Sequence, residues 1–597
     1  MGDELADKKI KIGGASGYWG ESAMATPQLL QVNDLDYLVY DYLAEITMSI
    51  MARAKAKDPA KGYATDFVEF VVRPFASQIM QKGVKLIANA GGVNPESCGD
   101  AVRKIIKDQG LDLKVAVITG DDLTRNKDAI VKEDLVDMFD ETPFPPVDKI
   151  MSINAYLGAF PIAKALDAGA DIVITGRCVD SAVTLGACIH EFGWQPSDFD
   201  LLASGSLAGH ILECGPQATG GNFTDWEDAD DIANIGYPVA EISSDGSFIT
   251  TKPEGTGGIV NVGTVSEQML YEIGNPSLYV LPDVICDFTS VEVEQQKENH
   301  VYVSPAKGNA APGTYKTCLT YMDGFRAGTY MTLYGENATS KAAKLADAGF
   351  DRAHKTLRLF NLGEFTETSI EILGAGSQKG KYHNTDEVVL KVAAKHPEAK
   401  AIGIFLKELV GLGLATPPGL SGFTGAGRAR PSPVVRLFSY LTPKDGIDIN
   451  IEIDGKNTIH NDIVAQTDFA TDVIPFPSPV SNTTEEVPLI KLAWGRSGDK
   501  GNKANVGIIA RKPEYMPYIW AALTEEKVGE IYAHFADDPA AVEKYYLPGS
   551  HAINFLIDNV LGGGGAASLR NDAQAKGYAQ LLLPTMIPVS KSIAKSL

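Results

Sequence analysis

The first two hundred residues alternate short apolar runs with segments of helical spacing, and this alternation restricts the fold more than any other feature of the chain. Runs rich in Val, Ile and Leu, typical of buried strands, occur at 9–12, 35–40, 84–88, 115–118 and 171–174. Helices are expected at 42–56, at 97–109 with Ser97 as N-cap, and at 155–168. Strands that alternate with helices form a parallel sheet covered by helices. We therefore expect an α/β fold with a mainly parallel sheet.

The rest of the sequence indicates an insertion, a linker and a second domain. Residues 237–340 carry short Val-, Thr- and Tyr-rich segments separated by Gly and Pro, which predict a β-rich insertion. Residues 446–453 alternate Ile with polar residues, as in a half-buried strand. Three prolines among small polar residues predict a linker at 471–486. The predicted domains are thus a large N-terminal domain at 8–470 and a small α+β domain at 487–590.

The balance of charges excludes several classes of partner. The chain carries 53 Lys and Arg against 76 Asp and Glu, a formal net charge of −23. Such a charge repels phosphate backbones and anionic membranes, so neither nucleic acid nor a membrane is an expected partner. The six cysteines are scattered without a C-x-x-C pair, which predicts reduced thiols in a cytoplasmic protein. Large intracellular α/β enzymes are often symmetric, so we expect a homo-oligomer.

Polar, glycine-rich loops follow the predicted strands. In open parallel sheets, ligands bind past the carboxyl ends of the strands, so these loops predict a pocket for a small-molecule substrate. The glycines of the first loop follow G-x-x-G-x-x-G, which is neither a dinucleotide fingerprint nor a P-loop, and we expect no nucleotide cofactor. The candidate binding residues in these loops are Gly14, Ser16, Gly17, Tyr18, Asn89, Gly91, Gly92, Asn94 and Arg177.

Arg177 and Asp180 after the fifth strand have two interpretations. Arg177 is suited to hold a carboxylate or phosphate with its planar guanidinium, and Asp180 to act as a base. Alternatively, Asp180 or Ser181 caps the next helix while Arg177 pairs with Asp180.

The densest polar cluster lies at 209–223. Spacings of three and four place His210, Glu213 and Cys214 on one side of a helical turn, which Gly215-Pro216 should end. Such a His and Glu can exchange a proton as an acid–base pair, whereas Cys214 beside His210 could be a thiolate nucleophile. The alternative is a buried His–Glu hydrogen bond with a core thiol. The motif lacks a convincing third and fourth metal ligand; its loop adds the candidate binding residues Gln217, Thr219 and Asn222.

The C-terminal domain contains a basic, glycine-bearing segment at 495–505. A loop of this composition can bind an anion through backbone N–H groups and cationic side chains, and Arg496, Asp499 and Lys500 are its candidate binding residues. Gly562–Gly565, with Ser568 and Arg570, is a second candidate of the same kind. A solvated turn explains either segment equally well.

On these motifs the chain resembles the acyclic terpene utilisation (AtuA-type) family, in its long form. The resemblance implies a ferredoxin-like C-terminal domain and a role in the catabolism of branched or terpenoid acids handled as coenzyme A thioesters. It supplies no catalytic residue. The segments that carry it are Gly13–Gly20, Asn89–Pro95, Thr175–Ser181, His190–Trp194, His210–Phe223, Arg496–Gly501 and Gly562–Gly565.

From the chemistry of these residues we predict a lyase that adds or removes water beside the carbonyl of an acyl-CoA or related carboxylic acid. Glu213 and His210 would move protons, while Asn89 and Asn94 would hold the carbonyl oxygen. A coenzyme A thioester is then a substrate rather than a cofactor. Two alternatives remain open: a hydrolase or acyltransferase that uses Cys214, and a non-catalytic partner subunit of an acyl-CoA carboxylase.

Overall fold

The computed structural model describes residues 8–21, 23–422, 427–462, 474–478, 480–536, 541–565 and 567–597. Its centre is an 11-stranded sheet in which five strands run parallel, in the order β1-β2-β3-β6-β4. The predicted α/β class is therefore confirmed. These strands are β1 (Lys9–Gly14), β2 (Tyr37–Tyr40), β3 (Lys85–Ala88), β6 (Ile172–Thr175) and β4 (Val115–Thr119).

Antiparallel strands extend the central sheet at both edges. Beyond β1 lie β7 (Val239–Ser243), β8 (Phe248–Thr251), β12 (His300–Val303) and β11 (Val293–Lys297). Beyond β4 lie β19 (Ile449–Ile453) and β20 (Lys456–His460). The predicted half-buried strand at 446–453 is thus β19, which returns to the sheet after a long excursion of the chain.

Helices cover both faces of the central sheet, because successive side chains of a strand point to opposite faces. On β3, Leu86 packs into one apolar core and Ile87 into the other. The core that includes Leu86 lies under α3 (Glu45–Lys57), α4 (Arg73–Lys82) and α5 (Pro95–Asp108). The core that includes Ile87 lies under α7 (Phe160–Asp167), α8 (Ala182–Phe192), α9 (Phe199–Glu213) and α10 (Val262–Leu270).

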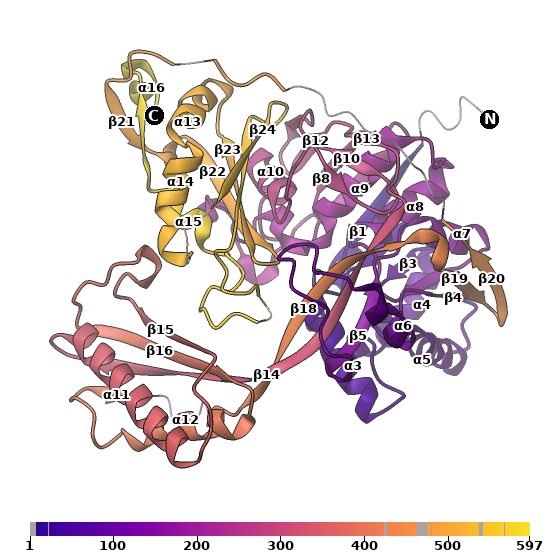
Figure 1. Ribbon diagram of the computed structural model, residues 1–597. Helices are drawn as coiled ribbons and strands as arrows, with labels where there is room; N and C mark the ends of the chain where they lie inside the picture. Colours follow the sequence, from indigo (N-terminus) through magenta and orange to yellow (C-terminus); the bar gives the residue numbers. More distant parts are fainter. Residues whose placement is uncertain are drawn as a thin grey trace.

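A second sheet forms an arm that projects from the N-terminal domain (Figure 1). Its axis is the 21-residue strand β14 (Thr314–Tyr334), which pairs with β18 (Ser432–Pro443) along much of its length. The first half of β14 also pairs with β5 (Ile150–Ala155), while its second half pairs with β16 (Glu387–His396). The far end of the arm has its own core, built with β15 (Glu367–Leu373), α11 (Ala338–Leu359) and α12 (Ala399–Gly411).

The C-terminal domain is a four-stranded antiparallel sheet with its own apolar core. Its strands follow the order β22 (Ala493–Lys500), β23 (Lys503–Ala510), β25 (Ala552–Ile557) and β24 (Val542–Leu547). Helices α13 (Met516–Ala522), α14 (Glu525–Tyr532) and α15 (Tyr578–Leu582) contribute to that core, and β21 (Glu485–Pro488) pairs with β26 (Met586–Val589). The domain docks on the N-terminal domain through Arg511, whose Nη1 and Nη2 each lie 2.6 Å from a carboxylate oxygen of Asp225.

Three local predictions differ from the structure. The helix expected at 155–168 begins only at Phe160, because residues 150–155 form β5. The N-cap of α5 is Asn94 rather than Ser97, since Pro95 takes the first helical position, where its missing N–H is not needed. Arg496, Asp499 and Lys500 lie on β22 of a hairpin rather than in an open loop, so the β-ladder with β23 occupies this stretch of backbone.

Part of the predicted linker, residues 471–473 and 479, lies outside the described residues. None of the helices in the described ranges combines the length and the apolar character needed to cross a bilayer.

Candidate functional site

The loops after β1 and β6 meet the end of α9 at one rim of the central sheet. A Cβ on Gly14 would lie 2.6 Å from the carbonyl oxygen of Leu212, and one on Gly17 would lie 2.9 Å from that of Glu213. A Cβ on Gly209 would likewise lie 2.7 Å from Cα of Ser181. Side chains at these three positions would push the backbones apart. The glycines therefore let the loops after β1 and β6 close against the 209–223 segment.

Two of the strand-end loops bring charged groups to this rim. Arg177 is buried, and its Nη1 lies 2.7 Å from Oδ1 of Asp180. Arg177 and Asp180 therefore pair, as the second interpretation of these residues predicts. The side chain of Ser181, however, makes no cap hydrogen bond to α8. Asp41, at the end of β2, accepts a hydrogen bond from the Asn89 amide. Burial raises the pKa of Asp41 well above its usual value, and the nearby carboxylate of Asp180 adds to this rise.

Glu213 and His210 are hydrogen-bonded to each other at the end of α9. His210 Nδ1 lies 2.8 Å from Glu213 Oε1, and His210 Nε2 lies 3.2 Å from the carbonyl oxygen of Met269. Because a carbonyl oxygen only accepts, Nε2 carries a proton and donates it. A second proton must then lie between Nδ1 and Oε1. Burial raises the pKa of Glu213, and Asp180 adds to this rise against the opposing effect of His210.

The two members of this pair differ in exposure. The side chain of His210 is 1% exposed and packs near the rings of Tyr279 and Phe288, whereas that of Glu213 is 12% exposed. The histidine is therefore a buried partner, and the carboxyl group is the member of the pair that faces the rim.

The hairpin of the C-terminal domain reaches the same rim. Lys500 Nζ lies 5.7 Å from the ring centre of Tyr279, and its charge acts on the carboxyl groups of Glu213 and Glu272. Lys576 Nζ lies 2.8 Å from Glu272 Oε1 and 3.9 Å from Asp499 Oδ1. Burial, followed by the charge of Glu272, raises the pKa of Asp499 to about 7. Both domains thus contribute ionisable groups to one site.

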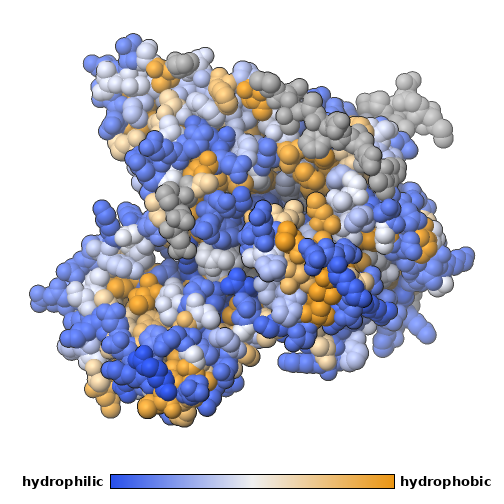
Figure 2. All heavy atoms as spheres, in the orientation of Figure 1, coloured by the Kyte–Doolittle hydropathy of each residue, from blue (hydrophilic) through white to orange (hydrophobic). Residues whose placement is uncertain are grey.

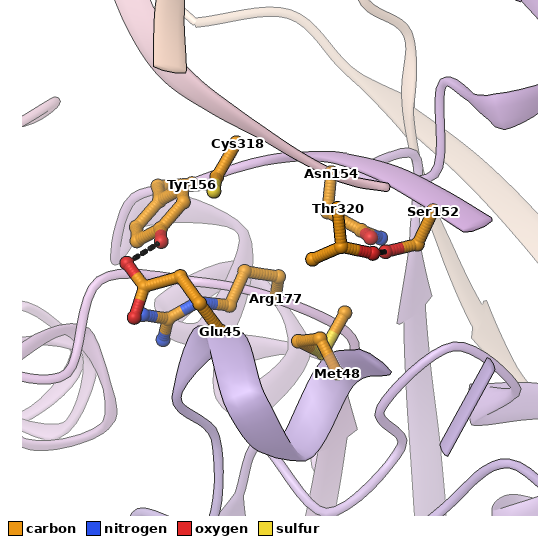
Figure 3. Close-up of a pocket in the computed structure, with 8 residues that line it drawn as sticks. All are labelled: Glu45, Met48, Ser152, Asn154, Tyr156, Arg177, Cys318 and Thr320. Atoms are coloured by element: carbon orange, nitrogen blue, oxygen red, sulfur yellow. Dashed lines mark hydrogen bonds between the residues drawn. The ribbon is translucent and has the colours of Figure 1, made fainter. Parts of the chain in front are cut away.

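A polar hollow adjoins Arg177 on the side of the arm (Figure 3). The space in it that a water-sized sphere can occupy is about 10 Å³, enough for about one water molecule. Tyr156 donates a hydrogen bond of 2.5 Å to Glu45 in its wall, and Lys316 Nζ lies 3.6 Å from the same carboxylate oxygen. Burial alone would raise the pKa of Glu45, but Lys316 and Arg177 outweigh it and lower the pKa to about 2. Glu45 is therefore a fixed anion, unlike Glu213. The hollow is lined by Glu45, Met48, Ser152, Asn154, Tyr156, Arg177, Cys318 and Thr320.

Two buried polar atoms of this hollow have no hydrogen-bond partner among the residues that the structure describes. They are Nε of Arg177, a donor, and Oδ1 of Asn154, an acceptor. Buried polar groups are almost always paired, and a single water molecule, which both accepts and donates, would satisfy them.

Several other predicted binding residues serve the loops themselves. Asn94 Nδ2 donates to the carbonyl oxygens of Pro59 and Lys61, and Thr219 Oγ1 donates to those of Pro216 and Gly236. Asn222 Nδ2 lies 3.3 Å from Gln217 Oε1, and Arg496 Nη1 donates to the Asn222 carbonyl oxygen. Through these hydrogen bonds the polar side chains stabilise the loops in which they lie.

The remaining predicted residues lie in the first two loops. Ser16 is buried and its hydroxyl donates to the carbonyl oxygen of Tyr18, whose side chain is exposed. A Cβ on Gly91 would lie 2.5 Å from the Thr175 carbonyl oxygen, and Gly92 has a φ of +55°. Gly91 therefore permits close contact between the loops after β3 and β6.

Sequence reasoning missed several residues of the site. Glu45 begins α3 a few residues after a predicted strand, so its place just past the strand end was a usable signal. Tyr279, Glu272 and Lys576 stand in no recognisable motif and reach the site only through tertiary contacts. Within the described residues, no group of three or more His, Cys, Asp or Glu side chains is arranged to hold a metal ion.

Comparison with known families fits this architecture. The model of the acyclic terpene utilisation family protein AtuA matches residues 10–453, and that of the AtuA ferredoxin-like domain matches residues 487–588. The chain belongs to the AtuA family. The resemblance drawn from the sequence motifs is thereby confirmed, and the family description links this protein to acyclic terpene utilisation. No curated protein and no solved structure matches the chain.

Proposed function

We propose that this AtuA-family protein is an enzyme of branched or terpenoid acid catabolism that adds or removes water beside the carbonyl of an acyl-CoA thioester or related carboxylic acid. The observation that carries the proposal is the hydrogen bond of 2.8 Å between His210 Nδ1 and Glu213 Oε1, at a rim that also carries cations. Water addition and removal require a group that exchanges a proton with carbon and a positive environment for the oxygen that gains charge.

In the direction of water removal, the proton shared by the pair stays on His210 Nδ1, so that Glu213 is a carboxylate and takes the proton from the carbon beside the carbonyl. Asp499, with a pKa of about 7, holds a proton that it gives to the departing hydroxyl group. The hydroxyl group leaves as water with the electron pair of its C–O bond, while the electrons of the broken C–H bond form the double bond. Arg177 and Lys500 stabilise the negative charge on the carbonyl oxygen.

The environment of Cys214 disfavours the alternative function, a hydrolase or acyltransferase in which this cysteine is a thiolate nucleophile. Burial and the neighbouring carboxyl groups of Glu213 and Glu272 raise the pKa of this thiol well above its usual value. The thiolate is the reactive form of cysteine, so such an environment keeps Cys214 unreactive near neutral pH.

Glu213→Gln tests the proposal, with turnover of branched 3-hydroxyacyl-CoA and enoyl-CoA thioesters as the measurement. The variant keeps the size of the side chain but cannot take a proton, so kcat should fall by a factor of about 10²–10⁴. Glu267→Gln is the matched control, because Glu267 is also a buried carboxyl whose pKa burial raises to about 7, yet it bonds the Thr224 backbone. Full turnover in Glu213→Gln would refute the proposed role of this carboxyl group.

A further inference from the structure

A loop of the C-terminal domain touches both the arm and the proposed catalytic site. This loop, called here the connecting segment, comprises residues 568–577 and leads into α15. We propose that Lys391 of the arm is a positioning residue, which holds the connecting segment and thereby places Lys576 against the carboxyl group of Asp499. The inference rests on the proposed function, in which Asp499 gives a proton to the departing hydroxyl group.

The ammonium group of Lys391 is fully used in its contacts at one end of the connecting segment. Its Nζ donates to Ser369 Oγ at 2.7 Å, to Glu371 Oε2 at 2.5 Å, and to the carbonyl oxygen of Leu569. A lysine has three N–H donors, and the side chain on β16 is 5% exposed. Removal of this lysine would leave buried acceptors without a donor, and it would release the carbonyl group of Leu569.

Two further residues of the arm hold the same stretch of backbone. Arg326 Nη1 on β14 donates to the carbonyl oxygen of Ser568 at 2.8 Å, and Glu371 Oε2 on β15 accepts from the backbone N–H of Asn571 at 2.9 Å. In Figure 1 the yellow loops of the C-terminal domain reach towards the arm, and in Figure 2 the surface is recessed where the arm and the two domains meet. Because these bonds engage backbone groups, the arm fixes the path of the main chain here.

Local contacts fix the rest of the connecting segment as far as Lys576. Asp572 accepts hydrogen bonds of 2.8 Å from the backbone N–H groups of Lys576 and Gly577. Ala575 is 0% exposed and has a φ of +54°, in the left-handed region that costs free energy for a residue other than glycine. The hydroxyl group of Ser497 on β22 donates to its carbonyl oxygen at 2.6 Å. A backbone strained in this way keeps its conformation only while its surroundings hold it.

The far end of the connecting segment faces Asp499. Gln574 Nε2 lies 3.4 Å from Asp499 Oδ1, and Lys576 Nζ lies 3.9 Å from the same oxygen. Lys576 Nζ also lies 2.8 Å from Glu272 Oε1. Only five residues separate Lys576 from Asn571, which the arm holds. The contact with the arm and the contact with Asp499 therefore belong to one short stretch of chain.

Four charged groups from four elements act on Asp499. Burial raises its pKa most strongly, and the carboxylates of Glu272, just past α10, and Glu45, on α3, add to the rise. Lys576, on the connecting segment, and Lys500, on the hairpin, oppose it. If Lys576 moved away, the carboxylates would raise the pKa of Asp499 further. The proposed acid would then keep its proton to a higher pH.

The pH dependence of kcat for water removal tests the proposal. Lys391→Met should move the alkaline limb of the profile upwards by as much as about one pH unit, the effect of a unit charge about 4 Å away in a solvated site. Lys576→Met, which removes the cation outright, should move the limb in the same direction by at least as much. Lys395→Met is the matched control. Lys395 lies on the same strand, is 4% exposed and pairs with Glu367, and among the described residues it makes no hydrogen bond to the connecting segment.

Labelling with an amine-reactive acetyl ester follows the connecting segment without any substrate. Mass spectrometry of the peptide that contains Lys576 should show labelling at least threefold faster in Lys391→Met, because an amine released from its ion pair with Glu272 is reached more easily by the reagent. The rate in Lys395→Met should equal that of the parent. Arg326→Met should act as Lys391→Met does, and it replaces that variant if Lys391→Met does not fold.

The two proposals fail separately. Equal labelling of Lys576 in the parent, Lys391→Met and Arg326→Met, or an alkaline limb that stays in place in both variants, would overturn the positioning role of Lys391. Full turnover in Glu213→Gln would refute only the catalytic proposal. The labelling rates would still decide whether the arm places Lys576, because they involve no turnover.

Discussion

Replacing Asp121 with asparagine should stabilise this protein increasingly as the pH rises from 5 to 8. Asp121 follows the end of β4 by two residues and is 2% exposed. Its Oδ2 accepts hydrogen bonds from the Arg177 backbone N–H at 2.9 Å and from Asn154 Nδ2 at 2.8 Å. Burial raises its pKa from 3.8 to about 7. The asparagine side chain would keep an oxygen acceptor for both donors and would resemble the protonated carboxyl group in shape.

The direction and the size of this stabilisation follow from proton linkage. Between pH 4 and 7 the folded chain holds a proton on Asp121 that the unfolded chain releases, so its stability falls as the pH rises. A pKa raised by about 3, at about 1.36 kcal/mol for each unit, costs about 4 kcal/mol at pH 8, and less than half of that at pH 5. The amide cannot ionise and avoids this cost.

Urea denaturation of the parent and of Asp121→Asn, followed by tryptophan fluorescence at pH 5, 6, 7 and 8, measures the difference directly. Other buried carboxyl groups titrate in both proteins and cancel. Asp122→Asn is the control, because Asp122 is the exposed neighbour of Asp121. The stability difference between the parent and Asp122→Asn should not grow as the pH rises. A difference between the parent and Asp121→Asn that stays constant from pH 5 to 8 would mean that the carboxylate is already ionised in the fold, and the reasoning would be refuted.

Two further predictions concern the thiol of the site and the contact between the domains. Cys214→Ser should keep turnover within about twofold in the thioester assay, because the raised pKa of the thiol makes thiolate attack unfavourable; a hundredfold loss would instead identify Cys214 as the nucleophile. Arg511→Met should weaken the docking of the C-terminal domain by about 1–3 kcal/mol, because it leaves Asp225 without its bidentate partner. Calorimetry should then show a lower first unfolding transition, and an unchanged transition would mean that other contacts hold the domains together.

The parallel core could be predicted because its signals are local. Each of its strands is a short apolar run followed by a polar loop, so both the strand and the end that carries the site can be read from neighbouring residues. Strand β5 was not predicted, for two reasons. Ile150–Ala155 lies directly before a segment with helical spacing, and the strand pairs with β14, which is far along the chain. The 21 residues of β14 were not predicted as one strand for a similar reason, since their burial depends on four different partner strands.

The candidate site was predictable to the extent that single segments build it. His210 and Glu213 belong to one helical turn, and Arg177 and Asp180 to one loop, so spacing alone placed each pair. The hairpin of Asp499 and Lys500 was mistaken for an open loop because its glycines suggested a turn, whereas the register with β23 makes them strand residues. Its meeting with Glu272 and Lys576 depends on the docking of two domains, which no local pattern encodes.

The late return of β19 to the central sheet has a consequence for synthesis of the chain on the ribosome. β4 is made early, yet the strand that covers its outer edge is translated only after more than half of the chain has followed. Until then β4 presents unpaired backbone groups of the kind that recruit other strands. A nascent chain that stalls within the arm would expose this unpaired edge of β4. Such a chain would be a substrate for chaperones.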